Sequence, residues 1–383
     1  VSDNVTKTEV DDLRTDTTGD ITLTSLTEDK GDLATINGFT DVILSTANIT
    51  VTDNVDKSEA DTIDAYNNTS GTVTLTSITD TVTNVTAVNT NANISIASAT
   101  VTVTDAASFA NADAINGFTI GKVTLNSVED TYSKIQDIKS IADGEVDMGA
   151  AAVKVTGNVT KTEVDDLRTD TSGNITLTSL TEDKGDLSTI NGFTDVILST
   201  ANITVTDNVN KTEADVIDAY SNTSGTVTLT SITDTVSNVT AVENNANISL
   251  DTSTITVTDA ATLANANAIN NFTSAQVTLQ KVQDTVSNIT SINGLTTSDV
   301  SMAAAAVTVT DAATLANANA INNFTTGQVT LNKASDTYRN LISLDSLTSS
   351  EVSMANATVT VTDVVDLRKV NALRNTTTGT VVL

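Results

Sequence analysis

The sequence predicts an α/β fold, a right-handed repeat solenoid of about eight units. A marker motif, Val/Ile-Thr-Val-Thr-Asp, returns along the 383 residues at steps of 50 or 52, and apolar and polar residues alternate within it. Units that bury their apolar faces only against their neighbours stack into solenoids. The aspartates of the motif are Asp53, Asp105, Asp207, Asp259, Asp311 and Asp363, and Asp3 and Gly157 stand at the two remaining positions.

Each unit is predicted to begin with a strand. In the segment 100–104, β-branched residues alternate as Thr-Val-Thr-Val-Thr, which predicts valines facing a core and threonines facing the other side. Asp105 then ends the predicted strand. It stands where a helix N-cap belongs, with its carboxylate placed to accept the free N–H groups of the next turn. A short helix is therefore expected directly after the marker.

Apolar residues three apart indicate this first helix and a second one. After Asp259 they are Leu263, Ala266, Ile269 and Phe272, which fits one or two turns of α-helix or 3₁₀-helix. A turn with glycine, at Gly71, Gly121, Gly173, Gly225 and Gly327, precedes a second strand such as 123–125. The second helix is indicated after Asp130 by Tyr132, Ile135, Ile138 and Ile141, after Asp284 by Val286, Ile289, Ile292 and Leu295, and after Asp336 by Tyr338, Leu341, Leu344 and Leu347.

A brief third extended segment closes each unit. These segments are 42–44, 94–96, 146–148, 248–250, 300–302 and 352–354. The unit is therefore strand, short helix, strand, short helix, short strand, and right-handed winding makes two coils of it, about fifteen in the chain. The usual strand separation predicts a step of about 4.8 Å per coil.

The whole chain, 1–383, is predicted to be a single continuous solenoid. Its units begin near residues 1, 49, 101, 153, 203, 255, 307 and 359. Both ends fall inside predicted elements, so we expect the chain to be a fragment of a longer polypeptide. A second level of repetition is present, because the segment 4–14 recurs letter for letter at 158–168, 154 residues later.

Composition excludes several classes of function. Lys and Arg total 18 against 48 Asp and Glu, a net charge of −30, which disfavours nucleic acid and anionic lipid as partners. Cysteine and histidine are absent, which removes disulfides, the commonest metal ligand and the usual general base. No apolar run is long enough to insert in a membrane. No catalytic triad, phosphate loop or dinucleotide motif is present, so we expect no enzyme and assign no catalytic residue.

Three features of the sequence have a functional interpretation beside a structural one. Oxygen ligands without histidine or cysteine favour calcium at the marker aspartates Asp53, Asp105, Asp207, Asp259, Asp311 and Asp363 as the alternative to an N-cap. Outward threonines such as Thr102 favour an ice-binding array as a remote alternative. Sequons at Asn84, Asn288 and Asn323 are typical of Asn- and Thr-rich sequence, and Ile289 and Phe324 within them are expected in the core.

Paired acids raise the question of a carboxylate dyad. Asp11-Asp12 and Asp165-Asp166 stand beside Lys7, Arg14, Lys161 and Arg168, which favours a solvated helix face instead.

The segment 307–331, with the wording VTVTDAATLANANAINNFTTGQVTL, resembles the repeats of very large secreted and cell-surface proteins of marine cyanobacteria. The resemblance covers essentially the whole chain and implies an extracellular or cell-surface structural role. Leucine-rich-repeat solenoids are similar more loosely, in architecture alone.

The function predicted from the sequence is therefore that of a non-enzymatic, extracellular, acidic repeat protein that serves as a fibre, spacer or surface-array element. Its expected partners are other copies or units of the same protein, and no cofactor is expected apart from calcium as the alternative above. A glycan- or cell-binding adhesin, or a phage-type fibre, is the second possibility.

Overall fold

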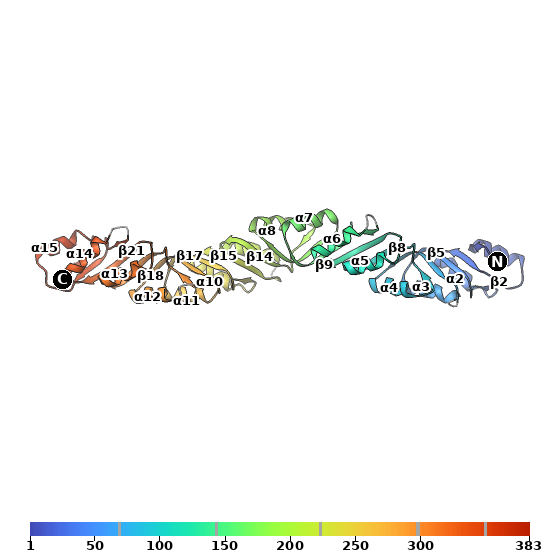
Figure 1. The fold of residues 1–383 in the computed structure, drawn as a ribbon, viewed down its shortest axis with the longest axis horizontal. Helices are drawn as coiled ribbons and strands as arrows, with labels where there is room; N and C mark the ends of the chain where they lie inside the picture. Colours follow the sequence, from blue (N-terminus) through green and yellow to red (C-terminus); the bar gives the residue numbers. More distant parts are fainter. Residues whose placement is uncertain (68–69, 142–144, 222–223, 296–298, 348–350) are drawn as a thin grey trace. The chain divides into compact units, whose positions relative to one another are not determined.

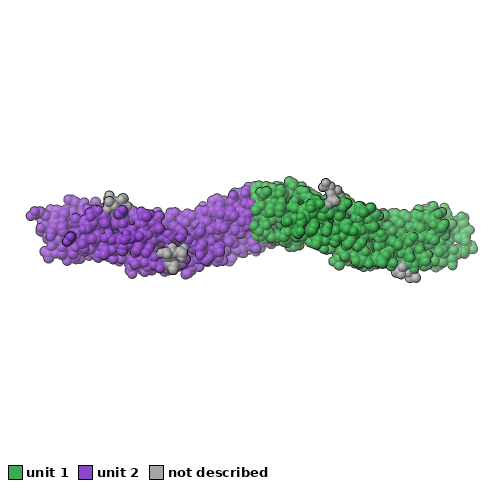
Figure 2. All heavy atoms as spheres, in the orientation of Figure 1, with its two compact units in different colours: residues 1–179, 190–198 green, residues 180–189, 199–383 purple. Residues whose placement is uncertain are grey.

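The computed structural model describes the chain except for residues 68–69, 142–144, 222–223, 296–298 and 348–350. The described residues form two compact units, shown in different colours in Figure 2. Unit 1 comprises residues 1–179 and 190–198, and unit 2 comprises residues 180–189 and 199–383. The prediction of one continuous solenoid from 1 to 383 stays a prediction.

Strands and short helices alternate throughout unit 1 (Figure 1). Its helices are α1 (Lys7–Asp16), α2 (Lys30–Asn37), α3 (Lys57–Asp64), the 3₁₀ turn η1 (Ala65–Asn67), α4 (Val82–Thr90), α5 (Phe109–Asn116), α6 (Tyr132–Ser140) and α7 (Lys161–Asp170). Its strands are β1 (Asn4–Val5), β2 (Ile21–Thr22), β3 (Ser25–Glu28), β4 (Val42–Ile43), β5 (Asn48–Val55), β6 (Val73–Asp80), β7 (Ile94–Ser95), β8 (Thr100–Ala107), β9 (Val123–Asp130), β10 (Val146–Asp147), β11 (Ala152–Val159) and β13 (Val196–Ile197).

Unit 2 repeats the same order of elements, and β12 (Ile175–Glu182) and α8 (Lys184–Asn191) contribute residues to both units. Its helices are α9 (Lys211–Asp218), the 3₁₀ turn η2 (Ala219–Ser221), α10 (Val236–Glu243), α11 (Leu263–Asn270), α12 (Val286–Gly294), α13 (Leu315–Asn322), α14 (Tyr338–Ser346) and α15 (Leu367–Arg374). Its strands are β14 (Asn202–Val209), β15 (Val227–Asp234), β16 (Ile248–Ser249), β17 (Thr254–Ala261), β18 (Val277–Asp284), β19 (Val300–Ser301), β20 (Ala306–Ala313), β21 (Val329–Asp336), β22 (Val352–Ser353), β23 (Thr358–Val361) and β24 (Val381–Val382).

In both units the strands pair in parallel with the strands that precede and follow them in sequence, and a short helix connects the long ones. β6, β8 and β9 illustrate the register: Ile78 lies beside Val101, and Val101 beside Val123. The predicted α/β repeat solenoid of strand, short helix, strand, short helix and short strand is thereby confirmed.

The short third strand belongs to the coil that follows it. Ile94 of β7 pairs with Val73 at the start of β6, and Thr100 of β8 pairs with Ser77 further along the same strand. β7 and β8 are therefore two parts of one interrupted strand, separated by a tight turn, and both lie beside β6. The sequence located these segments, but only the pairing shows that they open a coil rather than close a unit.

The strands are also staggered. Ala107 pairs with Val128, and Val128 pairs with Val153. Val153 is the residue of the next sequence repeat that corresponds to Val101. Corresponding residues of successive 50- or 52-residue repeats are thus displaced by six positions along the strand, roughly 20 Å of strand length. The expected step of about 4.8 Å per coil describes only the lateral spacing between strands and does not include this stagger along them.

The core lies between one face of the sheet and the helices that pack on it. Val103 of β8 and Val123 of β9 are fully buried, as are Ala112 and Ile115 of α5 and Ile135 of α6. The predicted three-residue spacing is confirmed at the two central positions of each ladder. Its outer members, such as Leu263 and Phe272, are half-buried, because a helix of two turns reaches the sheet only with its middle.

A glycine turn precedes the second long strand of most repeats and lies close against the backbone of the preceding coil. A Cβ on Gly121 would lie 2.2 Å from the carbonyl oxygen of Ala99, so the close approach of the two backbones favours glycine. The same carbonyl accepts a hydrogen bond of 2.6 Å from the buried Thr119 hydroxyl. In one sequence repeat, Ala275 stands at the position of Gly121 and Ser253 at the position of Ala99. Nothing in the structure explains how the Cβ of Ala275 is accommodated there.

Two isoleucines five residues apart separate core packing from surface exposure. Ile115 is fully buried and Ile120 is 86% exposed. We expect Ile115→Ala to lower the free energy of unfolding by about 2–5 kcal/mol, and Ile120→Ala to change it by about 0.5 kcal/mol or less. Urea denaturation followed by circular dichroism measures both, and equal losses would contradict the assigned core.

The 154-residue repetition predicts that a whole block can be removed. The sequence 44–55 is identical to 198–209, so deletion of residues 48–201 joins Ala47 to Asn202 within an unchanged local sequence. We expect this shortened chain to fold, with the same circular dichroism per residue and a cooperative melt. Deletion of residues 48–72 removes one coil and mismatches the neighbours, so it is expected to melt at lower temperature. Unfolding of the first variant would argue against interchangeable blocks.

Candidate functional site

The marker aspartates are the first candidates from the sequence, and the structure corrects their predicted role. Asp105 lies inside β8, which continues to Ala107, and the N-cap of α5 is Ser108. The Ser108 hydroxyl accepts the N–H of Asn111, and Asn111 Oδ1 accepts the N–H of Ser108 in a capping box. The prediction that the marker caps its own helix is wrong, because two further strand residues separate them.

Each marker caps a helix of the preceding coil instead. Asp105 Oδ1 accepts the N–H of Val82, the first residue of α4, at 2.7 Å. The same bond joins Asp53 to Lys30 (3.0 Å), Asp207 to Lys184 (3.0 Å), Asp259 to Val236 (2.8 Å), Asp311 to Val286 (2.8 Å) and Asp363 to Tyr338 (2.7 Å). Helix N-termini have N–H groups without intrahelical partners and attract negative charge, so these contacts are stabilising.

The acid that ends the second strand of a repeat caps a helix of the preceding coil with one oxygen and bonds the start of the helix that follows it with the other. Asp80 Oδ2 accepts the N–H of Lys57, the first residue of α3, at 2.8 Å. Its Oδ1 accepts the N–H of Thr81 and the amide of Asn84, both at 2.8 Å. The equivalent bonds to a preceding helix are Asp130 with Phe109, Asp234 with Lys211, Asp284 with Leu263 and Asp336 with Leu315.

These hydrogen bonds shift the titration of the second set of carboxylates. Burial alone raises the pKa of Asp80, but the N–H of Lys57, the Asn84 amide and the N–H of Thr81 together outweigh it and lower the pKa below its ordinary value. The pKa values of Asp234, Asp284 and Asp336 are lowered by the same balance. The folded state therefore stabilises the ionised form of these carboxylates.

Calcium at the markers stays a prediction. One oxygen of each marker carboxylate is already bonded to a helix N–H. In the described parts of the chain, no three acidic side chains are placed to hold one metal ion together. The geometry thus adds no second or third ligand to the single carboxylate that the sequence offers.

One acid of each pair, Asp11 or Asp165, forms an ion pair along its helix. Lys7 bonds Asp11 at 2.6 Å within α1, and Arg14 bonds Asp41 at 2.8 Å while its guanidinium lies 3.7 Å from the Phe39 ring centre. The copies 154 residues later repeat the pattern in Lys161–Asp165 and Arg168–Asp195. The Asp166 carboxylate also accepts the Tyr132 hydroxyl at 2.8 Å. Burial and then this bond raise the pKa of Tyr132 to about 12.

Two of the sequon asparagines, Asn84 and Asn288, have side-chain partners. The side-chain amides of Asn84 and Asn288 donate to Asp80 and Asp284 at 2.8 Å, so a glycan on either nitrogen would disturb the strand-end acid. Ile289 is in the core as expected. Phe324 is only half-buried, which corrects its predicted place in the core.

Outward threonines line up across the sheet in short rows. Thr79, Thr102 and Thr124 lie side by side on β6, β8 and β9. In unit 2 the equivalent row is Thr233, Thr256 and Thr278. Beside Thr124 the row continues to Asp147 and beside Thr278 to Ser301, where the short strands stop. The stagger of the strands therefore breaks the predicted flat hydroxyl array into rows of about three threonines.

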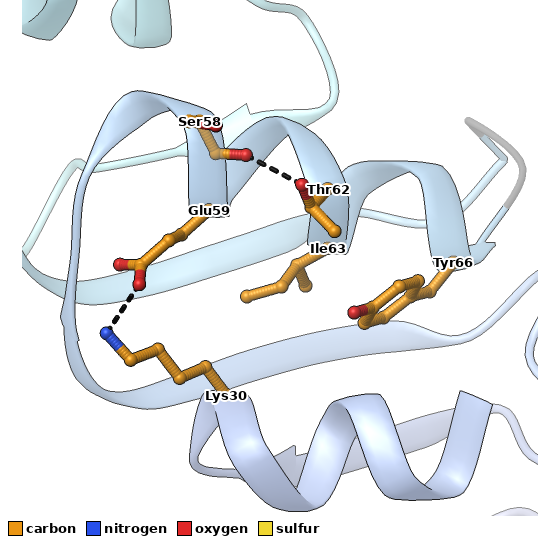
Figure 3. A pocket seen from close by; sticks show the side chains of 6 residues that line it. All are labelled: Lys30, Ser58, Glu59, Thr62, Ile63 and Tyr66. Atoms are coloured by element: carbon orange, nitrogen blue, oxygen red, sulfur yellow. Dashed lines mark hydrogen bonds and ion pairs between the residues drawn. The ribbon is translucent and has the colours of Figure 1, made fainter. Parts of the chain in front are cut away.

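The sequence did not indicate the hollow on the helix layer between α2 and α3 (Figure 3). Its volume is about 210 Å³, and Lys30, Ser58, Glu59, Thr62, Ile63 and Tyr66 line it. Lys30 Nζ and Glu59 Oε1 form an ion pair of 2.7 Å at one side. Ile63 lies between this pair and the Tyr66 ring, and the Tyr66 hydroxyl points towards the middle of the hollow (Figure 3).

A second hollow of about 200 Å³ lies between α8 and α9, with each lining residue 154 positions further on. Lys184, Glu213, Ile217 and Tyr220 repeat the frame, and Lys184 Nζ bonds Glu213 Oε1 at 2.9 Å. The rim differs, because Thr212 replaces Ser58 and Val216 replaces Thr62. The 154-residue repetition was the only sequence signal for this pair of sites.

Comparisons of the chain with protein-family models, with curated proteins and with solved structures find no match. The resemblance to cyanobacterial surface repeats therefore stays a prediction. Among the helices that the structure describes, none is both long and apolar enough to cross a lipid bilayer.

The cross-coil cap predicts where a mutation acts. We expect Asp105→Ala to lower stability by about 1 kcal/mol and to speed hydrogen exchange at the first turn of α4, around Val82. The control Asp113→Ala removes an exposed acid from the interior of α5 and is expected to leave α4 protected. Faster exchange confined to α5 in the Asp105 variant would restore the original assignment of this residue as the cap of its own helix.

The lowered pKa values also predict an acid-sensitive fold. A carboxylate with a folded pKa below its unfolded value of about 4 stabilises the fold fully above that value and loses its effect as pH falls through the folded pKa. We expect the urea midpoint to fall as pH decreases below about 4. Asp284→Asn cannot titrate and should make this decrease shallower, and an unchanged slope would contradict the assignment.

Proposed function

We propose that this chain is a non-enzymatic structural repeat protein that serves as a fibre, spacer or surface-array element outside the cell or at its surface. The observation that supports it best is that acids recurring along the chain bond the backbone of the preceding coil. Residues that recur in every copy serve the junctions between copies, as in a protein whose task is to extend by whole units.

The architecture supports a spacer in a second way. Each coil rests on its neighbours through strand pairing and helix packing, and most coils add a carboxylate cap, so repeats can be added or removed without altering a central site. The 154-residue repetition is consistent with such an addition within this chain. The charge of −30 keeps such an array soluble and favours contact with divalent cations over nucleic acid.

A glycan- or cell-binding adhesin is the second candidate, and the two equivalent hollows on the helix layer are the observation that favours it. Ice binding remains a remote alternative, because the outward threonines form rows of about three and their central members are half-buried.

Negative-stain electron microscopy of the purified chain tests the structural function. We expect ordered filaments or sheets, in the presence or absence of calcium, because other copies of the chain are its proposed partners. Single particles at all concentrations, with binding to a glycan array, would favour the adhesin. A turnover that is lost on replacement of one particular acid would revive an enzymatic function.

A further inference from the structure

The two hollows share an apolar floor and an aromatic wall. Ile63 is 2% exposed and gives the first hollow an apolar floor, and the Tyr66 ring gives it an aromatic wall. Ile217 and Tyr220 repeat both features in the second hollow. An amphipathic aromatic side chain with a polar end is typical of sites where a ligand is part apolar and part hydrated.

Several polar groups of each hollow have bonding capacity left. Within the described residues, the hydroxyls of Tyr66 and Tyr220 have no hydrogen-bond partner. The Lys30 ammonium bonds Glu59 at 2.7 Å and the Asn54 carbonyl at 3.3 Å, which leaves one of its three N–H donors. The Glu59 carboxylate accepts Lys30 through Oε1 and the N–H of Asp56 through Oε2, and each oxygen has a further lone pair.

The local electrostatics disfavour a charged ligand. The hydrogen bond from Lys30 lowers the pKa of Glu59, so the two side chains form an ion pair at neutral pH and cancel in charge. An anion would also meet the field of a chain with a net charge of −30, and a cation would meet the lysine ammonium. The remaining ligand class is neutral, rich in hydroxyls and apolar on one face.

We propose that each hollow binds one pyranose ring of a neutral glycan. The apolar face of the ring packs on the tyrosine, and its hydroxyls bond the tyrosine hydroxyl, the lysine ammonium and the glutamate. Volumes of about 210 and 200 Å³ suit one ring rather than a chain of several. The second hollow, with Val216 in place of Thr62, prefers a sugar that carries a methyl or acetyl group. This inference goes beyond the proposed structural function.

Saturation-transfer NMR on the full chain tests it, with glucose, galactose, mannose and N-acetylglucosamine as neutral probes and glucuronate and galacturonate as acidic ones. We expect transfer to the ring protons of at least one neutral sugar, with a dissociation constant on the order of 1–10 mM for so small a site. No transfer to any neutral sugar, or equally strong binding of the acidic sugars, would overturn the proposal.

Matched variants locate the sites. Tyr66→Ala with Tyr220→Ala should weaken binding at least about tenfold, because the aromatic wall is lost. Tyr66→Phe with Tyr220→Phe keeps the ring and should weaken it about fivefold, the value of one hydrogen bond. Ile120→Ala, which removes an exposed apolar side chain elsewhere, should leave binding unchanged. Circular dichroism checks that each variant is folded. If the alanine double variant does not fold, sugar binding by the phenylalanine double variant tests the proposal.

The result of the sugar-binding test does not depend on whether the chain assembles into filaments or sheets. Filaments without sugar binding would refute the site and leave the structural function, whereas sugar binding by particles that never assemble would support the site and refute the array. Unchanged binding in folded tyrosine variants would place the sugar elsewhere and overturn this proposal.

Discussion

The structure depends on a backbone problem that recurs in every coil: a helix of about two turns leaves as many N–H groups unpaired as it pairs. Its first four N–H donors have no intrahelical acceptor, and a helix of eight residues has few bonds besides. In most coils of this chain, a residue on the same coil caps the third helical N–H and an acid on the next coil caps the first; α6 is an exception, because its N-cap Thr131 makes no side-chain cap and Gly157 stands at the marker position. Ser108 and Asp130 do so for α5. Short helices that would be marginal alone are thereby tied to their neighbours.

This arrangement joins local structure to stacking. An Asp at a strand end is half-exposed and still accepts two or three hydrogen bonds, so its charge is stabilised without being deeply buried. Removing a coil would remove the cap of the coil before it, in addition to the apolar contact and the strand pairing. Three interactions of different kinds therefore depend on the same neighbour, which favours extension by whole units and disfavours a coil of foreign sequence.

The duplicated block shows which positions this constraint fixes and which it leaves free. Caps, core residues and the Lys–Glu–Tyr frame of the hollow recur 154 residues apart, and the rim of the hollow changes from Ser58 and Thr62 to Thr212 and Val216. These four rim residues are exposed, so they can vary without loss of the core. A surface function on such a scaffold belongs in places of this kind.

The sequence by itself determined the repeat, the order of strands and helices, and the buried side chains, because periods of two and three or four residues report directly on which faces are apolar. Val103, Ile135 and Ile289 were placed correctly for that reason. Only the tertiary structure decided the partner of each acid, the stagger of the strands and the positions of the hollows. Those depend on which residues of different coils lie next to each other. A pattern along one strand or helix does not say how that element is aligned with its neighbours. Asp105 illustrates the difference: its type and position indicate a helix cap, but the helix that it caps begins 23 residues earlier in the chain.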